Sequence, residues 1–401
     1  MDMGGLRRGY LIVCVVKSHR KWLMLQRRVS ILVGMILILV ILLGACTQSP
    51  ESKLPAGISG LVFTVSPMDI ESISRIVLLG NLNPPGHVFP TDHIYFYISN
   101  PNGDNRPDIV TLYSPGDLTV TAIEASEHVT AGFFDYSISL QSCEDIAVVL
   151  GHVSSLSKEI FGDTSVFERW TFMNEYSTGG ETYRSWRKVC TIQVTAGEVL
   201  GMVGGNPHQY ALDLGVYDQH HTHDNVANPN RWLRSLYLHA ICPLSLYEEG
   251  PVLDRLLDLV FQDEVEGDRR TRSGTLQDLP GTAQGCWFLS GISETYPEDP
   301  HLALVRSNIH PARAVLSVGN SIRGFDSATY EFLPETSGLL NRDFRDITPD
   351  EQIYGFQVNH FAGIIIVQMP DAETLWIEAL KSVTVDPASW AFTNDKTIFE
   401  R

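Results

Sequence analysis

Short alternating runs separated by turn residues are the feature that most restricts the fold of this chain. Between Ile58 and about Gly215, the chain shows short alternating or apolar runs rich in Val, Ile, Thr and Tyr, and turn pairs such as Asn102-Gly103 and Gly179-Gly180 separate the runs. A period of two in β-branched and aromatic residues predicts half-buried strands. The clearest runs cover 93–99, 118–123, 136–140, 147–150 and 189–194. Because no helix–strand alternation occurs, a parallel α/β sheet is not expected.

A helix candidate separates this part from a second β-rich part. It covers 251–262, where Pro251 suits a first turn and an apolar stripe includes Leu253 and Leu256. A charged loop is expected at 264–272. The second part contains predicted strands at 302–305, 363–368 and 375–378. We therefore expect a first β domain over 58–247, a linker with a helix over 248–273, and a C-terminal β-rich domain over 274–401.

The first 45 residues have the pattern of a secretion signal. Arg27 and Arg28 precede an apolar core of thirteen residues, 31–43, whereas a membrane-spanning helix needs about 20. The core ends in Leu43-Gly44-Ala45-Cys46, which resembles the lipobox of bacterial lipoproteins. That resemblance implies that Cys46 is diacylated, becomes the new N-terminus and anchors the protein at the extracytoplasmic face of a membrane. The alternative is an uncleaved anchor helix, and both interpretations export the same domain.

The leader is long, and Met24 would begin a more compact one. Residues 46–57, which follow the apolar core, are expected to be a flexible tether.

The first 45 residues hold seven basic residues and one acidic residue, so the remaining chain has 22 basic and 46 acidic residues and a net charge of −24. This charge argues against broad binding to nucleic acid or to anionic lipid headgroups.

Four cysteines remain beyond the leader and the lipidation site. They permit two disulfides with three alternative pairings, or free buried thiols, and their spacing is not that of a zinc knuckle. These residues are Cys143, Cys190, Cys242 and Cys286.

Four motifs follow one another in the first β domain. They cover 85–93, 114–123, 150–156 and 195–205, the last followed by a strand at 210–216. This order resembles the LytM/lysostaphin-type M23 zinc metallopeptidases and their lipoyl-like, duplicated-hybrid-motif relatives. The resemblance covers about 80–220. It implies an antiparallel β-sandwich in which two histidines and an aspartate hold one Zn²⁺ for the hydrolysis of peptide bonds in peptidoglycan.

The family's site residues carry over only in part. The resemblance implies His87, Asp92 and Asp213 as metal ligands and His152 as a catalytic histidine. The first motif reads His-x4-Asp where the family has His-x3-Asp, and one extra residue in a strand reverses the side-chain direction unless a bulge or turn absorbs it. Asp213 stands where a ligand histidine belongs, and Ala211 stands where a catalytic histidine belongs. A site of this composition fits Zn²⁺ or a harder divalent metal.

Further histidines are candidates for accessory ligands. His93 follows Asp92, although in a regular strand the two side chains would face apart. His221-Thr222-His223 is an HxH sequence that lies after the expected strand. The structural alternative for His87, Asp92 and His93 is a turn at a strand entrance. For His221 and His223 it is a polar surface loop.

Two functions are therefore expected. The first is an exported, membrane-tethered lipoprotein that has an M23-like domain with an altered active site and that binds peptidoglycan or an envelope protein. The alternative is an active metal-dependent endopeptidase or amidase that hydrolyses peptidoglycan peptides. A third interpretation is an assembly lipoprotein in which this domain is only a scaffold.

Overall fold

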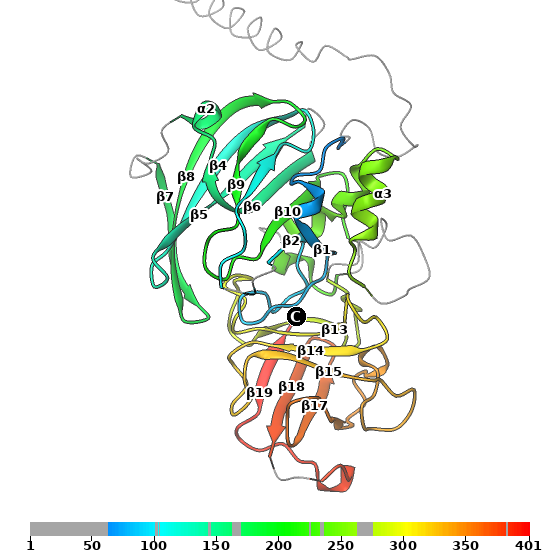
Figure 1. Ribbon diagram of the computed structural model, residues 1–401. Helices are drawn as coiled ribbons and strands as arrows, with labels where there is room; N and C mark the ends of the chain where they lie inside the picture. Colours follow the sequence, from blue (N-terminus) through cyan, green and yellow to red (C-terminus); the bar gives the residue numbers. More distant parts are fainter. Residues whose placement is uncertain are drawn as a thin grey trace, which may run out of the picture. The chain divides into compact units, whose positions relative to one another are not determined.

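The computed structural model describes residues 63–100, 103, 105–142, 146–162, 170–223, 226–232, 236–262, 276–381 and 384–401 (Figure 1). These residues belong to one compact unit. The leader, Met24, Cys46, the tether, Cys143 and the charged segment 264–272 lie outside the described residues.

The first sheet is antiparallel and follows the order β1-β2-β10-β6-β5-β4-β8-β7, with β3, β9 and β11 attached beside this path. Its strands are β1 (Ile73–Val77), β2 (Ile94–Ile98), β3 (Val110–Tyr113), β4 (Leu118–His128), β5 (Phe133–Gln141), β6 (Ile146–Leu156), β7 (Thr171–Thr178), β8 (Glu181–Val194), β9 (Val199–Val203), β10 (Ala211–Asp218) and β11 (Ala240–Ile241). Leu, Ile and Val from most of these strands form one buried cluster. The alternating patterns in the sequence supply this cluster, because every second residue of a strand points to the same face.

The second sheet is also antiparallel and has the order β15-β14-β13-β12-β19-β18-β17-β16. Its strands are β12 (Gly285–Leu289), β13 (Leu302–Arg306), β14 (Ala314–Val318), β15 (Ala328–Phe332), β16 (Tyr354–Phe356), β17 (Ile364–Asp371), β18 (Thr374–Leu380) and β19 (Thr397–Glu400). It has its own buried cluster, which includes Trp287, Phe356 and Phe399. The predicted fold class is confirmed: the chain is mainly β, with an antiparallel first part and a second β-rich part.

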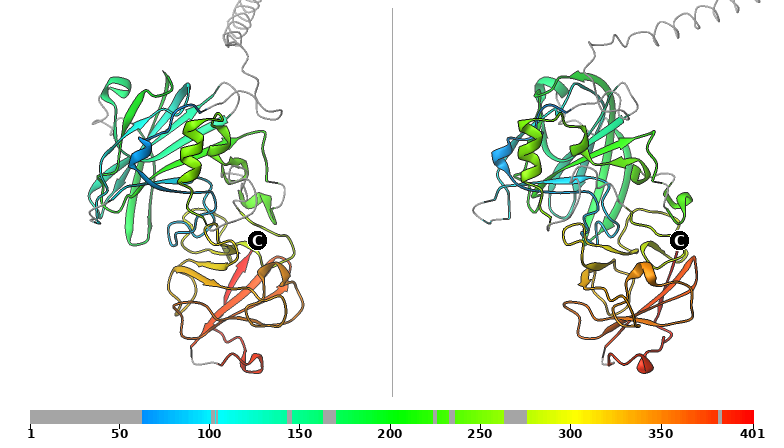
Figure 2. Two further views of the ribbon diagram at one scale, coloured as in Figure 1. Left: turned by 45° about the vertical axis from the view of Figure 1, so that its right-hand side comes forward. Right: turned by 90° about the vertical axis from the view of Figure 1, so that its right-hand side faces the viewer.

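Two α-helices are described, α2 (Lys158–Phe161) and α3 (Pro251–Asp258). Short 3-10 helices lie at Ile70–Ser72, Pro229–Trp232, Leu236–His239, Pro243–Leu246, Phe344–Asp346 and Pro387–Ser389. Helix α3 lies against the first sheet (Figure 2), where Leu253 and Leu256 join the core of that sheet. Within the described ranges, no helix is both long enough and apolar enough to cross a membrane.

Helix α3 ends four residues before the predicted boundary. Beyond it, Val260 forms a parallel bridge with Ile76 of β1, and the backbone N–H of Phe261 donates to the carbonyl of Ile76. The apolar side chain of Val260 fits a helical stripe equally well, but pairing with β1 satisfies backbone groups that the last helical turn would leave free.

The cysteines do not form the two disulfides that the sequence permits. Cys190 and Cys286 are free thiols, and Cys286 is almost fully buried. Two disulfides would require all four cysteines that follow the lipidation site.

Candidate functional site

The segment before β2 is a loop rather than a strand. Asn83 and His87 exchange backbone hydrogen bonds, and the N–H of Thr91 donates to the carbonyl of Asn81. The extra residue of the His-x4-Asp motif is therefore absorbed before β2 begins at Ile94.

This loop changes the expected orientation of His93. Because neither Asp92 nor His93 lies in a regular strand, their side chains do not face apart. Nδ1 of His93 lies 2.9 Å from Oδ1 of Asp92. The ring of His93 is also 5.4 Å from the ring of His87, centroid to centroid.

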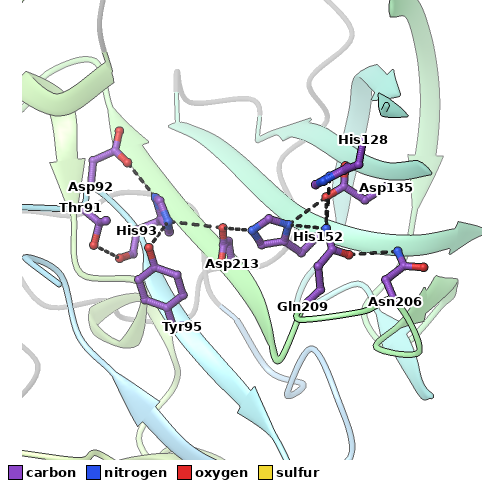
Figure 3. A network of polar contacts seen from close by, with 10 residues as sticks. All are labelled: Thr91, Asp92, His93, Tyr95, His128, Asp135, His152, Asn206, Gln209 and Asp213. Atoms are coloured by element: carbon purple, nitrogen blue, oxygen red, sulfur yellow. Dashed lines mark hydrogen bonds and ion pairs between the residues drawn. The ribbon is translucent and has the colours of Figure 1, made fainter. Parts of the chain in front are cut away.

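Asp213 lies at the centre of the candidate site. Strand β10 pairs with β2 on one side and with β6 on the other, so Asp213 is opposite both Tyr95 and Gly151. Its Oδ2 atom lies 3.4 Å from Nε2 of His93 and 3.3 Å from Nε2 of His152. Figure 3 shows the carboxylate between the two rings.

Gly151 leaves room for this carboxylate. A Cβ atom at residue 151 would lie 3.2 Å from Cβ of Asp213, which is a tight contact. The glycine that precedes His152 in the sequence thus has a direct role in the site.

His152 lies in β6 with a φ angle of 59°. A non-glycine residue with positive φ is uncommon, and such residues are concentrated at functional sites. The pairing of β6 with β5 is also irregular here, with a shift between Tyr136 and Ile138. This local backbone places Nδ1 of His152 2.9 Å from Oδ2 of Asp135.

Asp135 extends the site across β5 and β4. Its Oδ1 atom lies 3.3 Å from Nε2 of His128, and its Oδ2 atom accepts a 2.6 Å hydrogen bond from Nε2 of Gln209. The side-chain oxygen of Gln209 in turn accepts from Nδ2 of Asn206. A continuous polar network therefore runs from Asp92 to Asn206 (Figure 3).

The contacts of His152 favour its charged form. A neutral imidazole carries one N–H, whereas both nitrogens of this ring face carboxylate oxygens. Burial favours the neutral ring, but the carboxylates of Asp213 and Asp135 raise the pKa of His152 to about 9. Burial alone would raise the pKa of Asp135, and hydrogen bonds from His128 and His152 instead hold this pKa well below its usual range.

His93 has a similar environment with one additional partner. Burial opposes its charged form, and the carboxylates of Asp213 and Asp92 outweigh this effect and raise its pKa. The hydroxyl of Tyr95 lies 3.0 Å from Nε2 of His93. Burial raises the pKa of Tyr95 well above its ordinary value, so this hydroxyl keeps its proton at neutral pH.

His87 lies at the edge of the network. Its Nδ1 atom is 3.8 Å from Oε1 of Glu298, a buried residue that precedes β13. This nitrogen is buried, and no hydrogen-bond partner for it occurs in the part of the chain that the structure describes. The ring of His87 therefore adjoins the ring of His93.

Asp213 lies near the start of β10, and the HxH sequence follows the end of this strand. The rings of His221 and His223 are 4.8 Å apart, centroid to centroid. The carbonyl of His221 accepts from Nδ1 of His239, and Nε2 of His223 donates to the carbonyl of Ala240. These contacts fix the two histidines against the segment that leads into β11.

The side chains do not converge in the way that a metal site requires. Within the described residues, no group of three or more His, Cys, Asp or Glu side chains is arranged so that it could hold a metal ion. His93 and His152 lie on either side of Asp213 and contact its carboxylate (Figure 3). The described side chains therefore do not fit the zinc site that the resemblance implies.

The sequence interpretation did not identify Asp135, His128 or Gln209. Asp135 lies within an otherwise apolar and aromatic run, which is an unusual place for a carboxylate. That anomaly is the one signal in the sequence that marks it.

Comparisons with known proteins do not assign a family. No protein-family model matches the chain, and searches of the curated proteins and of the solved structures found no match either.

Proposed function

We propose that this chain is an exported lipoprotein whose first sheet binds cell-envelope material, such as peptidoglycan or an envelope protein, without hydrolysing it. The observation that carries the proposal is the engagement of His93 and His152 with the carboxylate of Asp213. A catalytic metal of the expected kind would need ligands that converge and leave one position open. Here the imidazoles of His93 and His152 and the carboxylate of Asp213 neutralise one another.

Ala211 supports the absence of hydrolysis. It occupies the position at which the resemblance implies a catalytic histidine, and its methyl group cannot orient water or stabilise an oxyanion. The polar network that surrounds Asp213 is instead suited to hold a fixed set of donors and acceptors for a ligand.

The leader supports export and lipid anchoring. The order of basic flank, apolar core, small residues and Cys46 in the sequence is the basis for this part of the proposal. Labelled palmitate should be incorporated into the wild-type protein and not into a Cys46→Ser variant. Equal labelling of both proteins would contradict the anchor.

The binding function can be tested with isolated peptidoglycan. The purified protein should sediment with the polymer and release no soluble fragments, with or without added Zn²⁺. An Asp213→Asn variant should bind less, whereas an Asp395→Asn variant, altered in an exposed ion pair with Arg323 in the C-terminal part of the chain, should bind like wild type. Release of fragments that a chelator abolishes would overturn the proposal in favour of an active endopeptidase or amidase.

A further inference from the structure

One face of the sheet beside the candidate site carries a row of aromatic rings. The register places Phe133 of β5 opposite His128 of β4, His128 opposite Tyr183 of β8, and Tyr183 opposite Tyr176 of β7. Residues directly opposite one another in an antiparallel sheet share a face. The row therefore crosses four strands, a distance of about 14 Å at the usual strand spacing.

The rings in this row contact one another. His128 stacks on Phe133 with a centroid distance of 4.1 Å and meets Tyr183 at 4.9 Å. Tyr183 stacks on Tyr176 at 5.0 Å. The hydroxyl of Tyr296, from the segment between β12 and β13, donates a 2.6 Å hydrogen bond to the hydroxyl of Tyr176. Because Nε2 of His128 also contacts Asp135, the row continues directly from the candidate site.

A second row on the same face is made of small polar side chains. Asp135 is opposite Ser126, Ser126 is opposite Ser185, and Ser185 is opposite Asn174. The hydroxyl of Ser185 donates to Oδ1 of Asn174 at 2.7 Å.

Part of this face is sheltered from solvent, whereas Asn174 at its edge is exposed. Asp135 is 6% exposed, Ser185 is 4% exposed and His128 is 9% exposed. The sheltered face of a sheet is normally apolar, so buried polar groups here need an explanation. Aromatic side chains next to a few polar groups are typical of ligand sites.

The groups on this face favour an uncharged ligand rich in hydroxyls. Phenol, hydroxyl, amide and imidazole groups can both donate to and accept from sugar hydroxyls. The charges on this face are balanced, because Asp135 faces the imidazoles of His128 and His152 and Glu124 is opposite Arg187. A balanced face offers no free cation to the carboxylates of a peptidoglycan stem peptide. We propose that the face formed by the two rows binds a neutral oligosaccharide, such as the glycan strand of the envelope polymer. This inference rests on the proposed function and names its ligand.

The test uses the full-length protein in detergent micelles and two soluble probes. The first probe is the tetramer of N-acetylglucosamine, and the second is a free stem peptide. Calorimetry should detect binding of the tetramer and not of the peptide. Asn174→Ala and Tyr296→Phe each remove polar atoms from exposed or half-exposed side chains and should weaken binding of the tetramer at least tenfold in combination. Tyr330→Phe, in β15 of the second sheet, is the matched control and should bind like wild type.

Three results would overturn the inference. They are failure to bind the tetramer, unchanged affinity in the Asn174→Ala/Tyr296→Phe variant, and binding of the stem peptide in place of the tetramer. Sedimentation with intact peptidoglycan distinguishes failure of the oligosaccharide proposal from failure of the proposed binding function. If the double variant still sediments with the polymer, the binding function stands and the assigned face is wrong. If wild-type protein does not sediment, both proposals fail.

Discussion

Nε2 of His152 lies 3.3 Å from Oδ2 of Asp213, and the opposite nitrogen of the same ring lies 2.9 Å from Oδ2 of Asp135. One imidazole thus joins two carboxylates that come from strands β10 and β5. An imidazolium in this position is attracted to both carboxylates and neutralises part of their charge. The stability of the first sheet is therefore linked to the protonation of a single ring.

The first prediction concerns stability at alkaline pH. The pKa of His152 is about 9 in the folded protein and about 6.5 in an unfolded chain. The stabilisation is complete below pH 6.5 and is lost as the pH rises through 9. Because 37% of the His152 side chain is exposed, solvent screens the contacts, and we expect a loss on the order of 1 kcal/mol.

Urea unfolding followed by tryptophan fluorescence at pH 6.5 and at pH 9.5 checks this prediction. An Asp213→Asn variant should show a smaller decrease over the same interval, because it retains only one of the two carboxylates that raise the pKa. Stability that stays constant or rises in the wild-type protein would contradict a charged His152.

The second prediction concerns Asp135. Asp135→Asn removes the charge that faces both His128 and His152 and places an amide where three donors, the third from Gln209, converge. Removing one partner of a buried charged network costs about 3 kcal/mol. The unfolding free energy should fall by this amount at pH 7. Asp395→Asn, which breaks an exposed pair with Arg323, should change it by at most about 0.5 kcal/mol. Equal effects of the two substitutions would show that the network has no special energetic role.

Much of the strand pattern follows from the sequence because burial alternates along each strand. Strand β2 corresponds to the run predicted at 93–99, and β13 to the run at 302–305. Strand β8 begins at Glu181, well before the run predicted at 189–194. Its first half is mostly polar, with Tyr183 and Trp186 three positions apart, and it is a strand because β4 and β7 pair with it on both sides. Such long-range pairing leaves no hydrophobic period in the local sequence.

The candidate site was predictable to a different extent at each residue. The motif order pointed to Asp213 and His152, which contact each other. The contact of Asp92 with His93 depends on a loop conformation that the strand period could not indicate. Asp135 depends on the register between β5 and β6 and on the irregular pairing beside His152. Register of this kind is set by the packing of the whole sheet.

The third prediction uses the glycines of β6 and β9. Gly151→Ala places a methyl group 3.2 Å from Cβ of Asp213, so the carboxylate must shift slightly. We expect a loss of less than about 1 kcal/mol at pH 6.5 and a smaller loss at pH 9.5, because the contact with His152 lengthens and its contribution exists only at the lower pH. Gly201→Ala instead directs its Cβ into the backbone carbonyl of Ser155, which cannot move away without breaking the sheet. It should destabilise the protein by more than about 2 kcal/mol at every pH. Urea unfolding of both variants at pH 6.5 and pH 9.5 distinguishes the two effects, and the same response from both would contradict the model of the site.

The fourth prediction concerns Glu298, which is 3% exposed. Its Oε1 atom accepts a 2.7 Å hydrogen bond from the hydroxyl of Tyr237, and its Oε2 atom accepts a 2.8 Å bond from the N–H of Phe89. These bonds hold the loop that carries His87 against the segment before β13. Glu298→Gln replaces one acceptor with a donor and should cost about 2 kcal/mol, and Tyr237→Phe should cost about 1 kcal/mol.

The two substitutions should not be additive, because each changes the same hydrogen bond between Glu298 and Tyr237. A double-mutant cycle of urea unfolding should give a coupling of about 1 kcal/mol between Glu298 and Tyr237. Glu71→Gln, which removes an exposed contact with Arg255, provides the control and should leave the unfolding midpoint unchanged. A coupling near zero would mean that Glu298 does not hold the loop before β2 through Tyr237. In that case the position of His87 beside His93 would have to depend on the backbone bond from Phe89 alone.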